Sequence, residues 1–221
     1  SFAVRRWPSL IAFATVLLIP ARVPLTVGSV EAQLLVPLYL VAGAAAVRLI
    51  VDVWRGDDEV DELGTISTPL ALFMTWSGLS LSWAVDVKQG AIELLFFYLP
   101  FGLLALCLAR VQWTRSLQKG LLYVLLGLGL LFAVVGIGQE VAHHVFWNPK
   151  VIVGNAYQSF YRVNSLFWDP SIYGRFLALA IAVALVVCLR RWSWTLAAVI
   201  GVLWVGLLFS YSQTSFVSLA V

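Results

Sequence analysis

The chain has 221 residues, of which 62% are hydrophobic and 11% are charged, and its formal net charge is +3. Soluble domains are nearer half apolar and a quarter charged, so this composition predicts a polytopic, all-α membrane protein and excludes an ordinary soluble domain. The small positive charge is not gathered into a basic stripe, which argues against nucleic acid as a partner and leaves the lipid bilayer as the expected surroundings.

Apolar runs follow one another along the chain, each long enough, or nearly so, to cross a hydrocarbon core of about 30 Å as a helix. A backbone in lipid must satisfy its own hydrogen bonds, so each run is predicted to be helical. The first run ends least cleanly, because Pro20, Arg22 and Pro24 crowd its end. We expect a single transmembrane domain over 1–221, with spans at 9–26, 30–51, 66–85, 91–109, 120–141, 171–189 and 193–210 and the start of an eighth at 216–221.

The distribution of Lys and Arg predicts the orientation of these spans. Most of the 14 Lys and Arg residues fall in the inner connectors if the N-terminus is cytoplasmic. The connector 142–170 then lies on the outer face. The acidic run 55–64 is interpreted as a solvated inner loop. The chain starts without Met and stops soon after an apolar run begins, so we expect it to be the N-terminal part of a longer protein.

The segment RVNSLFWDPSIYGR (162–175) is a short polar interruption between two apolar runs. Asp169 suits a helix N-cap and Pro170 suits the first helical position, so a helix is predicted to start here. Arg175 then falls in the second turn, where a cation gains nothing from the helix dipole. It either reaches toward lipid phosphates or holds an anion together with the helix start. Arg162 could converge on the same anion, and two guanidiniums would suit a diphosphate; the alternative is an interfacial belt with arginines paired to Asp169.

Gln139 and Glu140 end the fifth run and face the same outer connector. Glu140 could pair with an arginine or accept a proton. The adjacent His143 and His144 are a weak metal signal, so no metal site is predicted. The glycines of the fifth run lie inside an apolar helix rather than after a strand, so they are not nucleotide loops, and no cofactor is expected.

Three sequence blocks stand in order between residues 65 and 221. They are TWSGLSLSWAVDVKQGAIELLFFYLPFGLL (75–104), RVNSLFWDPSIYGRFLALAI (162–181) and LLFSYSQTSFVSLAV (207–221). In order and spacing they resemble the Ser-x-x-Trp-Ala-x-Asp, Arg-x-x-Gly/Ser-x-Phe-x-Asn/Asp-Pro and Thr-x-Ser-Arg blocks of the O-antigen ligase and O-antigen polymerase superfamily. The Gly-x-x-Gln/Glu ending of the fifth run agrees with the same family.

The resemblance implies a metal-independent glycosyltransferase of the bacterial inner membrane. The donor would be a glycan on undecaprenyl diphosphate, and the acceptor would be a hydroxyl of a glycan or lipid on the outer face. Arg162 matches the family's loop arginine and is therefore the first candidate for contact with the diphosphate, with Arg175 as the second. The family's catalytic histidine lies in a later loop, so the general base is expected beyond Val221, with Glu140 as the alternative proton acceptor. Residues expected to shape the site are Gln139, Asn164, Trp168, Asp169, Pro170, Tyr173 and Gln213.

The last block departs from the family, because it has Ser212-Gln213 where the family has Ser-Arg. A neutral amide cannot supply the expected cation. Either Arg175 compensates, or the substrate is different or less charged, or the chain belongs to an outlying subgroup. Two other functions remain: a transporter or flippase of lipid-linked glycans, and a non-catalytic scaffold of the envelope. The spans carry almost no central charges, which favours chemistry at one surface over passage through the membrane.

Overall fold

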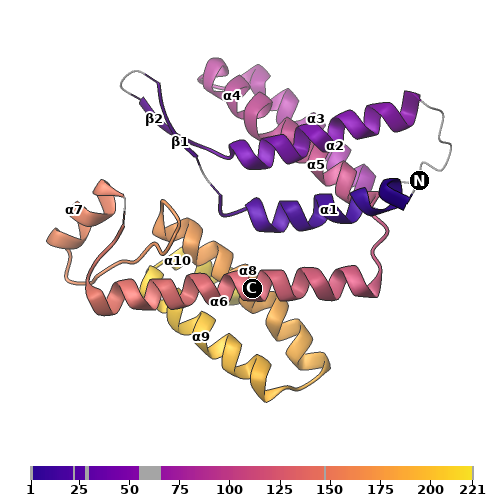
Figure 1. Cartoon of the computed structure of the whole chain (residues 1–221). Coiled ribbons are helices and arrows are strands. Elements are labelled where there is room, and N and C mark those ends of the chain that lie inside the picture. Colours follow the sequence, from indigo (N-terminus) through magenta and orange to yellow (C-terminus); the bar gives the residue numbers. More distant parts are fainter. Residues whose placement is uncertain (1, 22, 28–29, 55–65, 147, 221) are drawn as a thin grey trace. The chain divides into compact units, whose positions relative to one another are not determined.

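The computed structural model describes residues 2–21, 23–27, 30–54, 66–146 and 148–220 (Figure 1). Over these ranges the chain is helical apart from one β-hairpin, and it divides into two compact units, one of residues 1–19 and 23–117 and one of residues 20–22 and 118–221. The acidic run 55–64 lies outside the described residues.

Three helical stretches of the described chain are long and apolar enough to cross a membrane: Val87–Ala109, Arg115–Ala142 and Pro170–Arg190. Shorter apolar helices cover Ser9–Leu18, Val36–Arg48 and Trp194–Ser210. The length and composition of these helices are those of a helical membrane protein. The further spans expected from the sequence stay a prediction.

The first unit begins with a helix, a hairpin and a second helix. Helix α1 (Phe2–Leu18) is followed by strands β1 (Val23–Val27) and β2 (Val30–Leu34), and then by α2 (Val36–Trp54). The strands pair antiparallel, with Val23 opposite Leu34. The sequence predicts helix through both strand segments, and the structure differs because Pro20 and Pro24 cannot continue a helix, whereas a two-stranded ribbon tolerates proline at its edge.

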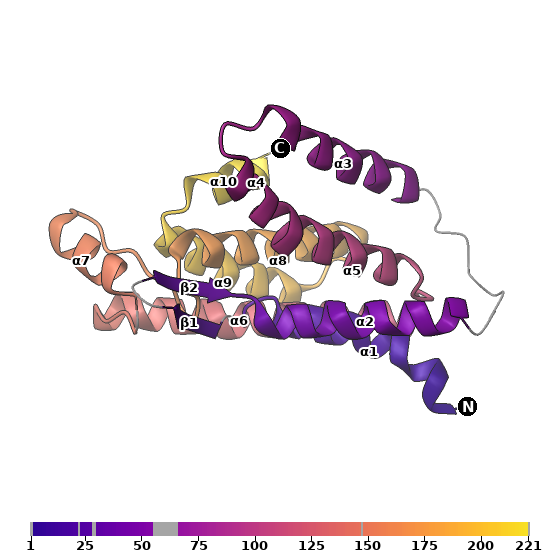
Figure 2. The same cartoon turned by 90° about the horizontal axis from the view of Figure 1, so that it is seen from above.

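The rest of the first unit is a helical hairpin. Helix α3 (Ser67–Leu79) ends in the 3₁₀ turn η2 (Ser80–Trp83), and α4 (Val87–Glu93) continues through the π-helical turn η3 (Leu94–Tyr98) into α5 (Leu99–Ala109). Figure 2 shows α4 and α5 as one rod running back beside α3. Pro100 has no N–H and its ring crowds the carbonyl of Phe96, and a local π turn relieves that conflict.

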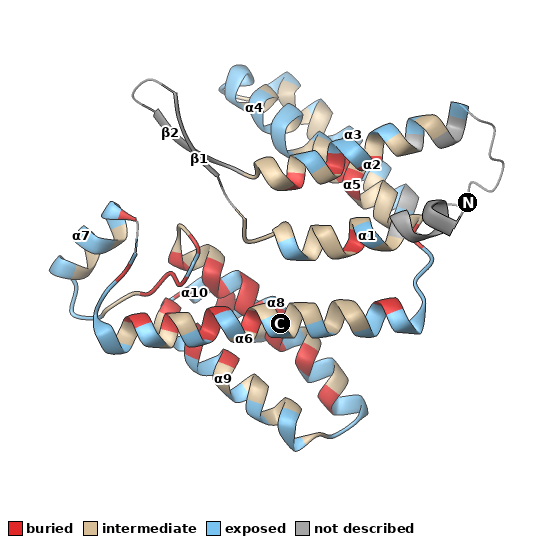
Figure 3. Cartoon of the chain, viewed as in Figure 1, coloured by how far each residue is buried: buried red, intermediate tan, exposed pale blue. Residues whose placement is uncertain are grey.

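The second unit is built around α8. Its helices are α6 (Arg115–Ala142), α7 (Pro149–Tyr157), α8 (Pro170–Arg190), α9 (Trp194–Ser210) and α10 (Gln213–Ala220). Figure 3 shows that burial concentrates along α8 and the neighbouring part of α6. Phe132 of α6 meets Phe176 of α8 edge to face at 5.4 Å. A Cβ on Gly129 of α6 would touch both Leu203 of α9 and Ala180 of α8, so the three helices pack closely here.

The start of α8 agrees with its sequence. The Asp169 carboxylate accepts a hydrogen bond from the Ser171 N–H at 2.7 Å, and Pro170 is the first helical residue. The preceding connector, expected as a loop over 142–170, contains a helix of its own. Asn148 caps α7 by accepting a bond from the Lys150 N–H, and Pro149 occupies its first position.

Candidate functional site

The connector between α7 and α8, residues 158–169, turns back into the second unit. Val163, Asn164 and Ser165 are 0% exposed, and Phe167 is 2% exposed. The Ser165 Oγ donates a hydrogen bond to the Phe132 carbonyl at 2.7 Å. At 1.5 Å per residue, Phe132 lies about 15 Å along α6 before its end at Ala142. The connector therefore reaches well below the end of α6, where each backbone polar group needs a protein partner.

Gln139 of α6 supplies such a partner. Its side-chain oxygen accepts the Ser165 N–H at 2.7 Å, and its side-chain nitrogen donates to the Ser165 carbonyl at 3.0 Å. Ser165 has a left-handed backbone with φ 52°, so its N–H and C=O both turn toward this side chain. We call this arrangement the Gln139 bidentate pair. It replaces the neighbouring strand or helix that would otherwise satisfy a buried peptide.

Asn155 of α7 makes the same arrangement with Arg162. The Arg162 N–H donates to the Asn155 side-chain oxygen at 2.9 Å, and the Asn155 side-chain nitrogen donates to the Arg162 carbonyl at 2.9 Å. This Asn155 bidentate pair fixes the main chain of the arginine that the sequence singles out. Two amide side chains from different helices therefore hold the connector at residues 162 and 165.

The Arg162 side chain reaches the junction of α9 and α10. Its Nε donates to the Ser210 carbonyl at 3.4 Å, and the next residue, Val163, donates its N–H to the Phe209 carbonyl at 3.1 Å. At this junction Tyr211 takes a left-handed backbone with φ 48°, which ends α9 and lets α10 start at Gln213. The guanidinium thus lies beside the start of a helix, where the first N–H groups have no acceptor in the helix itself.

Buried hydroxyls line the same junction. The Ser212 and Ser215 Oγ atoms lie 2.7 Å apart, and the Ser210 Oγ accepts the Ser212 N–H at 3.2 Å. A Cβ on Gly174 of α8 would lie 2.7 Å from the Ser212 Cβ and 2.8 Å from the Ser210 Oγ. Glycine is therefore required at this point of α8, and the hydroxyl cluster rests directly on it.

Glu140 follows Gln139 near the end of α6. Its Oε2 is buried and has no hydrogen-bond partner among the described residues. Burial raises the pKa of the nearby Tyr161 hydroxyl above its ordinary value and the Glu140 carboxylate raises it further, although hydrogen bonds with the Asn155 side chain and the Val145 backbone act the other way. The His143 ring lies 5.0 Å from the Tyr161 ring. Glu140 thus lies near the connector, with Tyr161 as its neighbour.

The other predicted residues do not all share one place. Arg175 is exposed on α8, and in the described part of the chain it has no bonding partner, so its convergence with Arg162 stays a prediction. In the described ranges neither Arg162 nor Arg175 forms an ion pair with Asp169, whose carboxylate caps α8. Gln213 is exposed at the start of α10.

Two predicted residues serve mainly to shape the second unit. Asn164 is fully buried and its side-chain nitrogen donates to the Trp168 carbonyl at 3.3 Å, which tightens the turn before α8. Tyr173 is fully buried within the helix bundle rather than at the connector's surface, and its hydroxyl has no partner among described residues.

The sequence interpretation missed Asn155, Ser165 and Ser210. Their contacts with the site span 7, 26 and 48 residues, so no local pattern marks them. A signal did exist for α7, because Asn148 followed by Pro149 is the same cap-and-proline pair as Asp169 and Pro170.

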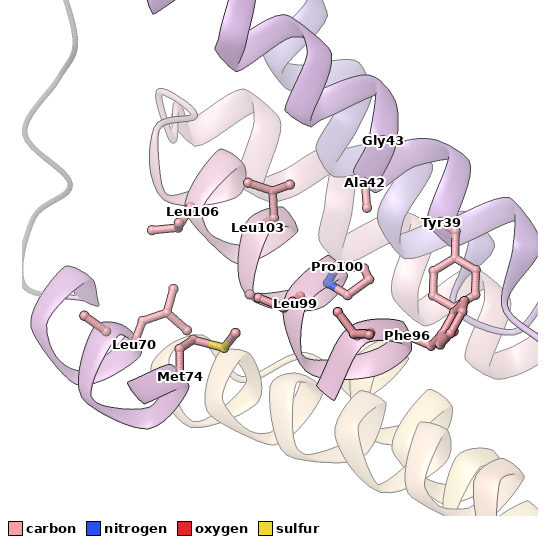
Figure 4. A pocket seen from close by; sticks show the side chains of 13 residues that line it. Tyr39, Ala42, Gly43, Leu70, Met74, Phe96, Leu99, Pro100, Leu103 and Leu106 are labelled. Carbon is pink, nitrogen blue, oxygen red and sulfur yellow. The ribbon is translucent and has the colours of Figure 1, made fainter. Parts of the chain in front are cut away.

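A second feature is an apolar groove in the first unit, with a volume of about 1010 Å³. Figure 4 shows Leu70 and Met74 of α3 facing Leu99 and Leu103 of α5, with Tyr39 of α2 at one end. The lining offers almost no polar atoms, so it suits hydrocarbon, and Tyr39 is the one described lining residue with a titratable side chain. In the described part of the chain, the site residues predicted from the sequence lie instead in the second unit, around the 158–169 connector and the helices beside it.

No group of three or more His, Cys, Asp and Glu side chains in the described ranges is placed to hold a metal ion. Comparison with known proteins adds no identity: no family model, no curated protein and no solved structure matches the chain.

Proposed function

We propose that this chain belongs to a membrane glycosyltransferase of the O-antigen ligase or polymerase type. It would move a glycan from undecaprenyl diphosphate to an acceptor hydroxyl of a glycan or lipid, without a metal or cofactor. In this proposal the chain has seven spans and the start of an eighth in a bacterial inner membrane, with a cytoplasmic N-terminus and the 142–170 connector outside.

The observation that supports the proposal best is the setting of Arg162. This residue carries the sequence resemblance, its main chain is held by Asn155, and its Nε lies 3.4 Å from the Ser210 carbonyl, next to the start of α10. Guanidinium and helix N-termini both favour phosphate oxygens. With Nε directed at Ser210, the terminal nitrogens remain for an anion. Arg175, exposed on α8, is the second proposed contact.

The proposed reaction needs charge stabilisation on one side and a proton acceptor on the other. The acceptor oxygen attacks the anomeric carbon, the bond from that carbon to the diphosphate oxygen breaks, and the departing undecaprenyl diphosphate keeps the electron pair. Arg162 would stabilise this growing negative charge. The proton of the acceptor hydroxyl passes to a base, which is Glu140 in this chain or a group beyond Val221.

The decisive experiment replaces Arg162 in the complete protein and measures glycan transfer in membranes. Removing one charge-stabilising group of this kind typically lowers the rate by about 10²–10³-fold. We expect Arg162→Ala to lose transfer on that scale while lipid-linked donor accumulates. Arg162→Lys should recover only part, because an ammonium cannot bind Ser210 and a phosphate in the same fork geometry.

Arg190→Ala is the matched control, since Arg190 is exposed in the last turn of α8, away from the connector. The control should transfer glycan like the wild type. Normal transfer by Arg162→Ala, at equal protein level in the membrane, would overturn the proposed function. Movement of the lipid-linked glycan between leaflets without transfer would instead favour the transporter or flippase function.

A further inference from the structure

We infer that Asn155 and Gln139 are positioning residues, whose side-chain amides set the direction in which Arg162 presents its guanidinium to an anionic diphosphate. The inference rests on the proposed function, because it concerns the same arginine. It adds a cause for the orientation of that arginine, which would otherwise be a long and mobile side chain on a connector.

The chemistry of the two positions requires amides. Each side chain accepts one backbone N–H and donates to the carbonyl of the same residue, Arg162 for Asn155 and Ser165 for Gln139. A neutral carboxamide carries one acceptor and one donor group, whereas a carboxylate carries only acceptors. Replacement by aspartate therefore keeps the bond from the Arg162 N–H and sets an oxygen against the Arg162 carbonyl.

The Asn155 bidentate pair holds both backbone groups of Arg162, and the Gln139 bidentate pair holds the chain three residues further on. Between residues 162 and 165, the Val163 N–H also donates a hydrogen bond, to the Phe209 carbonyl. The Cα of Arg162 is therefore fixed on both sides, and its side chain starts from one place. The bond from Nε to the Ser210 carbonyl then fixes the far end. Preorganisation of this kind reduces the entropy lost when a charged side chain binds a ligand.

The test uses Asn155→Asp in the complete protein, reconstituted in lipid nanodiscs, with undecaprenyl diphosphate as the probe. We expect its dissociation constant to rise about tenfold or more at pH 7.5, as one hydrogen bond is replaced by a repulsion. A protonated aspartic acid again has one donor and one acceptor. The ratio of the variant's constant to that of the wild type should therefore return toward one as the pH falls.

Two variants complete the design. Asn155→Ala lacks both hydrogen bonds at every pH and should stay weak throughout. Gln158→Glu places a new negative charge on an exposed residue at the end of α7 and should bind like the wild type. Thermal unfolding of each variant shows whether it is folded. If Asn155→Asp does not fold, Gln139→Glu replaces it, because that change removes the corresponding donor to the Ser165 carbonyl.

The outcomes separate the inference from the proposed function. Binding by Asn155→Asp equal to the wild type, or a pH-independent loss identical to that of Asn155→Ala, would overturn the positioning role while Arg162→Ala still loses binding. Undiminished binding by Arg162→Ala would overturn the proposed function itself.

Discussion

Tyr173 packs against two glycines, and this contact sets how closely three helices approach. A Cβ on Gly136 of α6 would lie 2.8 Å from the Tyr173 Cζ and closer still to its Oη. A Cβ on Gly206 of α9 would lie 2.8 Å from the same Oη. The Tyr173 side chain is fully buried, so the ring cannot move aside into solvent. Glycine at both positions makes the room that the ring occupies.

Gly136→Ala is therefore expected to destabilise the second unit. Overpacking of a close-packed core costs about 1–3 kcal/mol, and the better helix propensity of alanine offsets up to about 1 kcal/mol. With the full propensity gain subtracted, the net loss is about 0–2 kcal/mol. Gly127→Ala is the matched control in the same helix, because a Cβ there meets no atom within 4 Å. The control should therefore be stabilised by the better helix propensity of alanine, without a steric clash.

The free energy of unfolding can be measured by titration with dodecyl sulfate in mixed micelles. Tyr173→Phe should be neutral or stabilising, since the buried hydroxyl has no partner in the described chain. The Oη is also the atom nearest the new methyl group, so the double variant with Gly136→Ala should lose less than the sum of the single changes, by about 0.5 kcal/mol or more. Equal stability of Gly136→Ala and Gly127→Ala would refute the steric argument.

Two further predictions concern the end of α6 and the site beside it. His143 takes a left-handed backbone with φ 49° where its N–H bonds the Glu140 carbonyl, so His143→Gly should be about 1 kcal/mol more stable than His143→Ala in the same micelle titration, and equal stability would contradict this. The raised pKa of Tyr161 means that the folded state prefers the protonated hydroxyl, so its contribution to stability is complete below pH 10.0 and is lost as the pH rises through the folded pKa. Unfolding temperatures from pH 8 to 11 should fall more steeply for the wild type than for Tyr161→Phe, and parallel curves would argue against the shift.

The parts of the fold that follow from local sequence could be predicted. Asp169 and Pro170 start α8 because cap and proline act on the residues beside them. The apolar runs of α6 and α8 are long enough to be read directly as spanning helices. The hairpin could not be predicted in the same way. Its Val and Leu residues extend the neighbouring apolar runs. Strand pairing between Val23 and Leu34 depends on a partner that a periodicity argument does not see.

The site shows the same division. Arg162 could be selected because it stands in a motif, yet its orientation depends on Asn155 and Ser210, which only the folded chain brings near it. Arg175 is the second candidate in the sequence, since it is a cation in the second turn of a predicted helix. The structure separates them, because Arg162 is bonded into the α9–α10 junction while Arg175 is exposed on α8. Whether an arginine side chain is held in one orientation depends on contacts with residues that are far away in the sequence.

The choice of amides rather than carboxylates at the two bidentate pairs preserves the charge of Arg162. A carboxylate at Asn155 would set a negative charge against the Arg162 main chain, and desolvating that charge would carry a cost of its own. The neutral side chains of Asn155 and Gln139 satisfy the buried backbone without adding charge. Glu140 follows Gln139 on α6, where successive side chains point about 100° apart, so its carboxylate approaches Tyr161 while Gln139 binds Ser165. Within the described ranges Arg162 forms no ion pair, so its positive charge is held in place and remains available to a phosphate.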